Sequence, residues 1–332
     1  MAGLILVLPG LVCASEAAVP TEQAKATPAE WYAQYVRYGE LVPLGNGRSL
    51  NLYCAGSGSP AVVLEAGLGE SAFTWWAVQW SIARQTRVCA YDRAGSGGSP
   101  PGPFPRDTRA QVADLETLLS AAKMAPPYIL VGHSMAGYNM RVLAARHLRD
   151  VAGMVLVDPS TENQIELFRS AIPAIAASEK ASLARVQACA NPGRTFEIAA
   201  QCTRRPPPSF PPVLAKIFAE RQGLTAAQTN LSEFVSFRTL DSRQLSAESR
   251  RFGSMPLIVL TRGTMLDGLP KDQAELQWKL WNETHERVAK LSTAGSNRVV
   301  AGSGHYIHID KPDAVIAAVA EVINLARRRR PR

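Results

Sequence analysis

The sequence of 332 residues lacks the features that mark a membrane or nucleic-acid-binding protein. The apolar stretch near its N-terminus is too short to span a bilayer as a helix. Aromatic residues make up only 7% of the chain, and no stripe of basic residues is interleaved with them. The net charge of +8 includes five arginines in the terminal segment 327–332. The sequence therefore predicts neither a nucleic-acid partner nor a stable membrane span.

Cysteine is also scarce. None of the five cysteines has the paired spacing of a zinc site, so no metal is expected. Cys189 and Cys202 flank a polar segment and could close a short loop in an oxidising compartment, with free thiols as the alternative. Cys54 and Cys89 lie in apolar, strand-like runs, where we expect two small buried side chains.

The N-terminus has the pattern of an export signal. An apolar run followed by a small-x-small site, Ser15–Ala17, predicts a signal peptide over residues 1–17 and a periplasmic or secreted protein. No Lys or Arg precedes the apolar run, so the alternative is an apolar arm on a cytoplasmic protein. Residues 18–40, rich in Thr, Ala, Pro and Glu, are expected to form a linker.

Beyond the linker, strand patterns alternate with helical ones. Asn46-Gly47 between two apolar runs predicts a β-hairpin, and the later alternation predicts a parallel sheet with covered faces. From Ser160 to Phe252 the spacing is mostly helical without a convincing strand, which predicts a helical lid inserted after the sixth strand. The expected organisation is core 41–159, lid 160–252, core 253–326 and basic tail 327–332.

The most informative segment is Tyr128–Gly137, which reads Tyr-Ile-Leu-Val-Gly-His-Ser-Met-Ala-Gly. Its short apolar run predicts a buried strand, and the small residues around the serine allow a sharp strand-to-helix turn. Such a nucleophile elbow raises the serine hydroxyl above the edge of the sheet. Ala136 stands where Gly-x-Ser-x-Gly has its second glycine, and Gly137 follows directly. We therefore predict Ser134 as a nucleophile.

A serine hydroxyl needs a base to take its proton. His305 lies in the glycine-rich segment 301–306, between the last strand and the final helix, where a turn can present its imidazole beside Ser134. His133 adjoins the serine, but alternation along the strand should point it away, and His308 lies deeper in its segment. The sequence thus predicts His305 as the base.

Two carboxylates compete to orient this histidine. Asp158 ends the strand that follows the Ser134 helix, and Asp267 follows the next strand. Either can reach a histidine at the same edge, where a carboxylate fixes the tautomer and stabilises the imidazolium. Asp158 has the less ambiguous position and is favoured, with Asp267 as the alternative. The developing oxyanion needs donors as well, and we assign the backbone N–H groups of Met135 and Leu68 to that role.

With these residues in place, the chain resembles the α/β-hydrolase superfamily, most of all the bacterial lid-bearing serine hydrolases and esterase-like members with a Tyr-Asp-Arg-Ala-Gly-x-Gly-x-Ser turn, here Tyr91–Ser99. The resemblance covers roughly residues 40–160 and 250–326. It implies an eight-stranded, mostly parallel sheet with helices on both faces, the chain order Ser, acid, His, and no cofactor. Glu65-Ala66-Gly67 stands where many members have His-Gly, so the oxyanion loop is of a less common type.

The expected function is hydrolysis of a carboxylic ester of a small-molecule acyl substrate. An amidase, peptidase or lactonase would use the same groups, so the ester is what the resemblance implies. A nucleophilic serine in place of an aspartate argues against epoxide hydrolase or dehalogenase chemistry. The alternative from a different functional class is a ligand-binding protein built on a hydrolase scaffold.

Overall fold

The computed structural model describes residues 34–202, 210–248 and 250–329. The predicted signal peptide, most of the predicted linker and the last residues of the basic tail lie outside the described residues. Among the helices of the described ranges, none has both the length and the apolar character of a membrane span.

An eight-stranded sheet forms the centre of the molecule, in the order β1-β2-β4-β3-β5-β6-β7-β8. β2 runs antiparallel to β1 and β4, and the other neighbouring pairs are parallel. The mostly parallel sheet expected from the sequence is therefore confirmed. The strands are β1 (Glu40–Gly45), β2 (Arg48–Ala55), β3 (Ala61–Glu65), β4 (Val88–Tyr91), β5 (Tyr128–His133), β6 (Val151–Val157), β7 (Leu257–Arg262) and β8 (Gly295–Val300).

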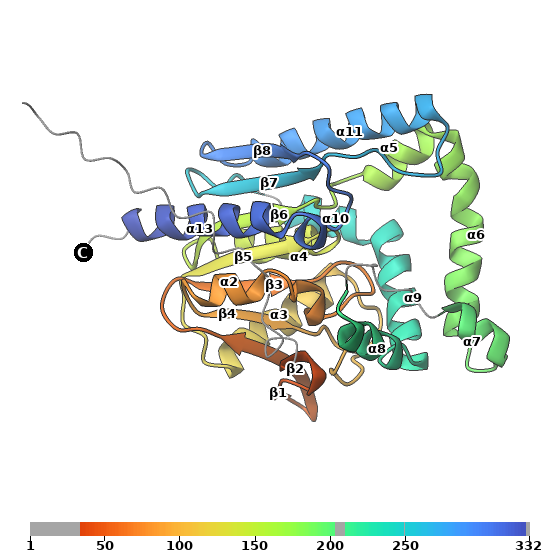
Figure 1. Ribbon diagram of the computed structural model, residues 1–332, viewed down its shortest axis with the longest axis horizontal. Coiled ribbons are helices and arrows are strands. Elements are labelled where there is room, and N and C mark those ends of the chain that lie inside the picture. Colours follow the sequence, from red (N-terminus) through yellow and green to blue (C-terminus); the bar gives the residue numbers. More distant parts are fainter. Residues whose placement is uncertain (1–33, 203–209, 249, 330–332) are drawn as a thin grey trace, which may run out of the picture.

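Helices cover both faces of this sheet (Figure 1). Successive strand residues point to opposite faces, so Val63 enters one apolar core while Val62 and Leu64 enter the other. The first core is closed by α3 (Thr108–Ala121), α4 (Ala136–Arg146) and α11 (Lys271–Ala289). The second is closed by η2 (Ala72–Trp75), α2 (Gln79–Ala83), α12 (Ile307–Asp310) and α13 (Pro312–Arg329).

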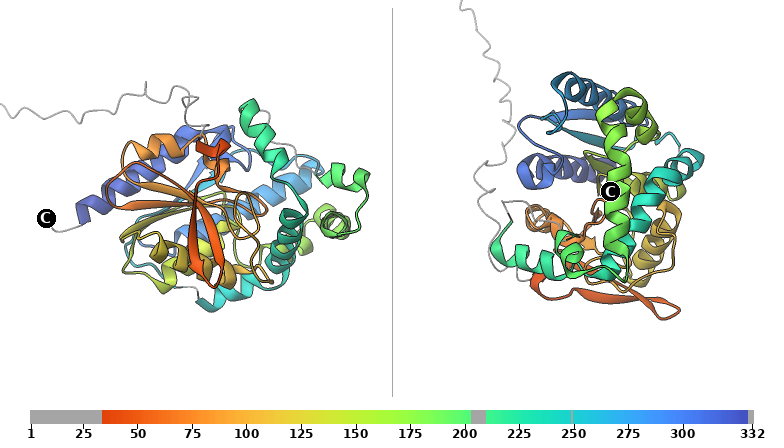
Figure 2. Two further views of the ribbon diagram at one scale, coloured as in Figure 1. Left: turned by 90° about the horizontal axis from the view of Figure 1, so that it is seen from below. Right: turned by 90° about the vertical axis from the view of Figure 1, so that its right-hand side faces the viewer.

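The segment between β6 and β7 is helical wherever the structure describes it. Its helices α6 to α9 stand together at the right-hand side of Figure 1, and α6 crosses in front of the sheet in the right-hand view of Figure 2. α10 instead packs on α3 and α4 of the core. The helices are α5 (Gln164–Ala171), α6 (Pro173–Ala190), α7 (Phe196–Cys202), α8 (Pro212–Glu220), α9 (Leu224–Thr239) and α10 (Asp241–Glu248).

The start of the predicted basic tail belongs to the final helix. α13 continues through Arg329, so residues 327–329 belong to the helix. The guanidinium of Arg327 donates hydrogen bonds to the carbonyl oxygens of Ser59 (3.2 Å) and Gln85 (2.8 Å). Arg327 therefore attaches the final helix to the loops that precede β3 and β4.

Two disulfides join the four cysteines of the described residues. Cys189 and Cys202 are bonded and link α6 to α7. Cys54 and Cys89 are bonded as well, so the expectation of two buried thiols is wrong, and Cys54 is exposed. The physical reason is the pairing of β2 with β4, whose antiparallel register sets Cys54 directly opposite Cys89.

We expect the Cys54–Cys89 bond to stabilise the fold, because it closes a loop with a sequence separation of 35. A loop of that size predicts a loss of about 3–4 kcal/mol in the free energy of unfolding when Cys54→Ala and Cys89→Ala are combined, as an upper value. Urea unfolding of the oxidised protein measures it. The matched control repeats the measurement under reducing conditions, where the free energies of unfolding of the double variant and the wild type should differ far less. Equal stability of the oxidised forms would contradict the prediction.

Candidate active site

Ser134 occupies a strained turn between β5 and α4. Its φ of +53° lies in the left-handed region, which non-glycine residues seldom adopt. The turn is tight: a Cβ on Gly132 would come 2.7 Å from Cγ of Met140 and 3.0 Å from the backbone of Ala136. Only glycine fits at 132, and the small Ala136 fits opposite it. The side chain of Ser134 stays partly exposed above the edge of the sheet.

The register of the parallel strands brings four loop starts together. Gly132 of β5 pairs with Glu65 at the end of β3, and His133 pairs with Val157 at the end of β6. Val157 in turn pairs with Leu260 of β7. The residues that follow β3, β5, β6 and β7 therefore meet at the carboxyl edge of the sheet, where open α/β sheets bind ligands.

At this edge a continuous chain of hydrogen bonds joins Ser134, His305 and Asp158. Nε2 of His305 lies 3.0 Å from Oγ of Ser134, and Nδ1 lies 2.6 Å from Oδ2 of Asp158. A carboxylate accepts only, so Nδ1 carries the proton and donates it. In the neutral ring Nε2 is then the acceptor for the serine hydroxyl, which is the arrangement of a general base.

Asp158 is fully buried, and donors from two further elements hold it in addition to His305. Its Oδ1 accepts hydrogen bonds from the backbone N–H of Arg262 (3.0 Å) and from Nε1 of Trp281 in α11 (2.7 Å). Its Oδ2 accepts a bond from the guanidinium of Arg262 (3.0 Å). Arg262 and Trp281 were missed by the sequence analysis, because a strand-end arginine and a helix tryptophan carry no local signal of a carboxylate partner.

These donors keep Asp158 ionised. Burial by itself would raise the pKa of the carboxyl group, but the hydrogen bond from His305 and the charge of Arg262 outweigh it and hold the pKa of Asp158 well below its usual range. His285, which lies beside this group and bonds to the carbonyl oxygen of Pro159 (2.8 Å), behaves in the opposite way. Burial lowers the pKa of His285 to about 4, so it is neutral and adds no second charge.

The pKa of His305, the predicted base, is also shifted. His305 keeps 33% of its side-chain surface accessible, but its ring packs against those of His133 and Tyr306. Burial lowers the pKa of His305 below the ordinary 6.5; Asp158 acts in the opposite direction, and His133 adds to the lowering. The imidazole is therefore neutral, and able to accept a proton, down to a lower pH than a free histidine.

His133 connects the histidine loop with the loop after β3. Its Nε2 donates to the carbonyl oxygen of His305 (3.0 Å), and its Nδ1 lies 3.2 Å from Oε2 of Glu70. The same carboxylate oxygen accepts a hydrogen bond from the backbone N–H of Gly67 (3.1 Å). The ring nitrogens of His133 thus face the backbone of His305 and Glu70.

The two residues predicted to supply oxyanion donors lie on either side of the serine. Met135 follows Ser134 directly and is buried at the start of α4. Leu68 follows Gly67, where an added Cβ would come 3.2 Å from Cβ of Ser134. The backbone of the loop after β3 therefore comes as close to the nucleophile as a glycine permits.

Asp267 lies apart from this group. After β7 the N–H groups of Gly263 and Thr264 bond to the carbonyl oxygen of Ser303 (3.0 Å each), and the chain then continues into an exposed turn that contains Asp267. The hydrogen bond to Nδ1 of His305 comes from Asp158 instead. Of the two carboxylates left open by the sequence, the structure brings only Asp158 to the histidine.

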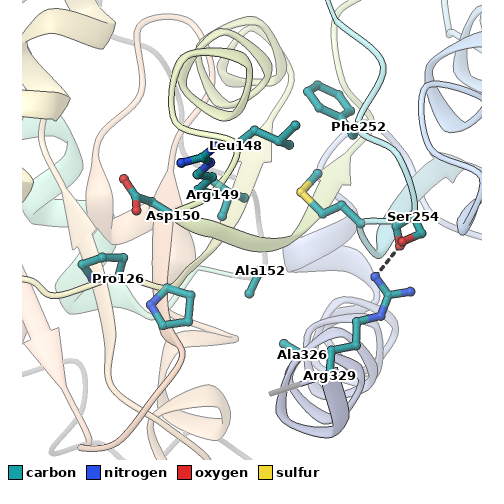
Figure 3. Close-up of a pocket in the computed structure, with 12 residues that line it drawn as sticks. Pro126, Leu148, Arg149, Asp150, Ala152, Phe252, Ser254, Ala326 and Arg329 are labelled. Atoms are coloured by element: carbon teal, nitrogen blue, oxygen red, sulfur yellow. Dashed lines mark hydrogen bonds between the residues drawn. The ribbon is translucent and has the colours of Figure 1, made fainter. Parts of the chain in front are cut away.

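A cavity of about 220 Å³ adjoins the loop after β3. It is lined by Leu68 and Gly69 on the core side and by residues of α6, α7 and α9 on the other, among them Val186 and Phe234. A second pocket, of about 480 Å³, lies at the amino ends of β5 and β6, with Pro126 and Ala152 in its wall (Figure 3). It is at the edge of the sheet opposite Ser134, whereas the smaller cavity adjoins the loop after β3, which approaches the serine.

In residues 34–202, 210–248 and 250–329, no group of three or more His, Cys, Asp and Glu side chains could hold a metal ion.

The sequence profile described as the alpha/beta hydrolase family matches residues 62–318. The chain belongs to the α/β hydrolase family, and is a hydrolase by that membership. It is 28% identical over 267 residues to YqjL of Bacillus subtilis, covering 80% of this chain and 85% of that protein. It is 24% identical to the sn-1-specific diacylglycerol lipase ABHD11 of Mus musculus, covering 83% and 84%.

Among solved structures, a thermophilic esterase from Thermogutta terrifontis has the same fold as this hydrolase. The TM-score is 0.60 at 18% identity, and the match covers 87% of this chain and 99% of that one. At this identity the likeness speaks for the fold alone.

We expect the imidazole of His305 to titrate below pH 6.5, because burial disfavours its charged form. Asp158→Asn should lower this pKa further, since the carboxylate is the group that favours the imidazolium. Imidazole ¹H–¹⁵N spectra recorded against pH measure both values, with His305→Gln as the variant that assigns the resonance. A wild-type pKa at or above 6.5 would show the prediction to be wrong.

Proposed function

We propose that this α/β hydrolase is a serine hydrolase of carboxylic esters that works through an acyl-enzyme. The observation that carries the proposal is the continuous hydrogen-bonded chain from Oγ of Ser134 through His305 to Asp158. A partly exposed serine hydroxyl with a neutral imidazole at 3.0 Å and a buried carboxylate behind it is the arrangement that activates serine for acyl transfer.

In the proposed reaction Oγ of Ser134 attacks the ester carbonyl carbon while its proton passes to Nε2 of His305. The carbonyl oxygen becomes an oxyanion, which the backbone N–H groups of Leu68 and Met135 stabilise. The carbon–oxygen bond to the alcohol breaks, and His305 returns the proton to the leaving alcohol. Water then attacks the acyl-enzyme by the same route and releases the acid and the free serine.

Asp158 has two roles in this scheme. It holds the Nδ1–H tautomer, and its negative charge stabilises the imidazolium that forms during each attack. The hydrogen bond from His305 and the charge of Arg262 together hold the pKa of Asp158 well below its usual range, so the carboxylate is ionised where His305 is neutral. Asp267, being exposed and without this bond to the histidine, has no role in the proposed mechanism.

An ester is favoured by one curated relative, since ABHD11 is described as a diacylglycerol lipase. Solved structures of the same fold include both the Thermogutta terrifontis esterase and an enol-lactonase from Burkholderia xenovorans, so the fold does not decide between an ester and a lactone. An amidase, peptidase or lactonase with the same three groups is the second candidate. We also propose that helices α5 to α10 act as a lid, because α6, α7 and α9 line the cavity beside Leu68.

An oxidising location is proposed as well. Two disulfides within one chain are typical of exported proteins, since cytosolic thiols are kept reduced. This agrees with the apolar N-terminus and its small-x-small site, which predict a periplasmic or secreted protein.

Replacing the nucleophile should abolish turnover. Ser134→Ala removes the atom that forms the acyl-enzyme, and we expect hydrolysis of p-nitrophenyl butyrate to fall by at least about 10³-fold. A fluorophosphonate probe should label the wild type and not the variant, as read by intact mass. A panel of amides and lactones run beside the esters decides between the candidates. Full activity of the folded Ser134→Ala protein would refute the proposal.

The two candidate acids give a matched pair of variants. Asp158→Asn leaves an amide that no longer fixes the productive tautomer, and we expect kcat to fall by about 10⁴-fold. Asp267→Asn is a chemically identical change in the exposed turn and should leave kcat within about twofold. Steady-state kinetics on one ester, with circular dichroism for folding, makes the comparison. The reverse order of effects would assign the acid to Asp267.

A further inference from the structure

The loop after β3, which contains the proposed oxyanion donor Leu68, is held by a buried arginine. Arg93 lies just after β4, is 3% exposed, and donates through its guanidinium to the carbonyl oxygens of Ala66 (2.5 Å) and Gly67 (2.6 Å). These are charge-assisted bonds, which are shorter and stronger than those between neutral groups. The carbonyl groups of two successive peptides are therefore fixed by one rigid side chain.

The bond to Gly67 has a geometric consequence for Leu68. A trans peptide is planar, and the carbonyl oxygen of Gly67 and the N–H of Leu68 lie in that plane and point in opposite directions. By holding that oxygen, Arg93 sets the direction of the Leu68 N–H. If this peptide turned over, it would present its carbonyl oxygen to the developing negative charge, where a donor is needed.

The other end of the loop is held from the inserted helical segment. Glu233 of α9 is fully buried, and its Oε2 accepts a hydrogen bond from the backbone N–H of Gly69 (2.9 Å) across 164 positions in sequence. Its Oε1 accepts a second bond, from Nε of Arg93 (2.8 Å). The peptide planes before and after Leu68 are thus both held by one Arg–Glu pair.

The pair is balanced in charge and tightly packed. Burial alone would lower the pKa of Arg93, but Glu233 and Glu65 outweigh it and keep the guanidinium charged. One turn earlier, α9 packs on the Gly95 turn so closely that an added Cβ there would come 2.0 Å from Oγ1 of Thr229. α9 therefore has no room to approach the core further, and Glu233 reaches the loop from a fixed position.

We propose that Arg93 and Glu233 are positioning residues for the oxyanion hole, so that helix α9 of the inserted segment determines the orientation of the Leu68 N–H. This inference rests on the proposed serine-hydrolase function and assigns to the inserted segment a part in transition-state stabilisation. Neither side chain contacts the substrate; each acts through the backbone of the loop.

The test compares Glu233→Gln with Ser232→Ala, the preceding residue of the same helix. Ser232 also links α9 to the core, because its Oγ accepts a hydrogen bond from the backbone N–H of Arg106 (2.8 Å). This bond does not involve the loop after β3. With p-nitrophenyl butyrate we expect Glu233→Gln to lower kcat by roughly 10- to 100-fold, less than loss of a whole donor. KM should stay within about twofold, and Ser232→Ala should change neither constant by more than that.

A pair of ketone inhibitors separates positioning from general loosening of the fold. A trifluoromethyl ketone adds the Ser134 oxygen to its carbonyl carbon, passes the proton to His305 and leaves an oxyanion in the hole. The corresponding methyl ketone binds without forming that adduct. Glu233→Gln should lower the affinity for the trifluoromethyl ketone by the same factor as it lowers kcat/KM, and should leave the affinity for the methyl ketone unchanged. A merely structural role would lower both affinities.

Glu233→Asp provides a second variant that keeps the buried charge but shortens its reach, in case the loss of the Glu233 charge beside Arg93 prevents folding. A folded Glu233→Gln or Glu233→Asp protein with wild-type kcat and wild-type trifluoromethyl ketone affinity overturns the positioning role. That result together with an inactive Ser134→Ala leaves the proposed function standing, whereas an active Ser134→Ala overturns the function itself.

Discussion

The carboxylate of Asp158 is the group on which the arrangement of the candidate active site depends. A charge with no access to water must be stabilised by nearby donors, and here they come from three separate elements. The end of β7 supplies Arg262, α11 supplies Trp281 and the loop after β8 supplies His305. Each donor fixes its own element relative to β6, so the position of the histidine follows from the need to satisfy one buried charge.

A second buried charge organises the opposite side of the serine. Arg93 and Glu233 satisfy each other and the polar backbone of the loop after β3, while Glu70 joins the same loop to His133. A buried ion pair of this kind adds little net stability, since desolvation offsets its attraction. Its proposed role is to orient the peptide groups near Ser134. In a site of low dielectric, the orientation of such groups carries most of the electrostatic effect.

Local sequence was sufficient to predict the strands and the sharp turn at Ser134, because an apolar run and a sharp turn are properties of neighbouring residues. The order of the sheet was not predictable in this way, which led to one error and left one alternative open. Cys54 and Cys89 were predicted to be separate buried side chains, because the local sequence does not show that β2 and β4 are adjacent. Asp267 remained a candidate until the turn after β7 is seen to lead it into solvent. Helix α11 went unassigned, and with it the Trp281 contact to Asp158.

The same reasoning explains why Glu233 could not be found from the sequence, and what its position implies. Asn230 and Phe234, which line the cavity beside Leu68, lie three residues before and one residue after Glu233 on α9. Residues at this spacing share one side of a helix or neighbouring sides. One helix therefore both lines the cavity and holds the loop after β3. Under the proposed roles, a substitution that moves α9 to fit another acyl chain also turns the Leu68 peptide, so substrate fit and oxyanion geometry cannot vary independently.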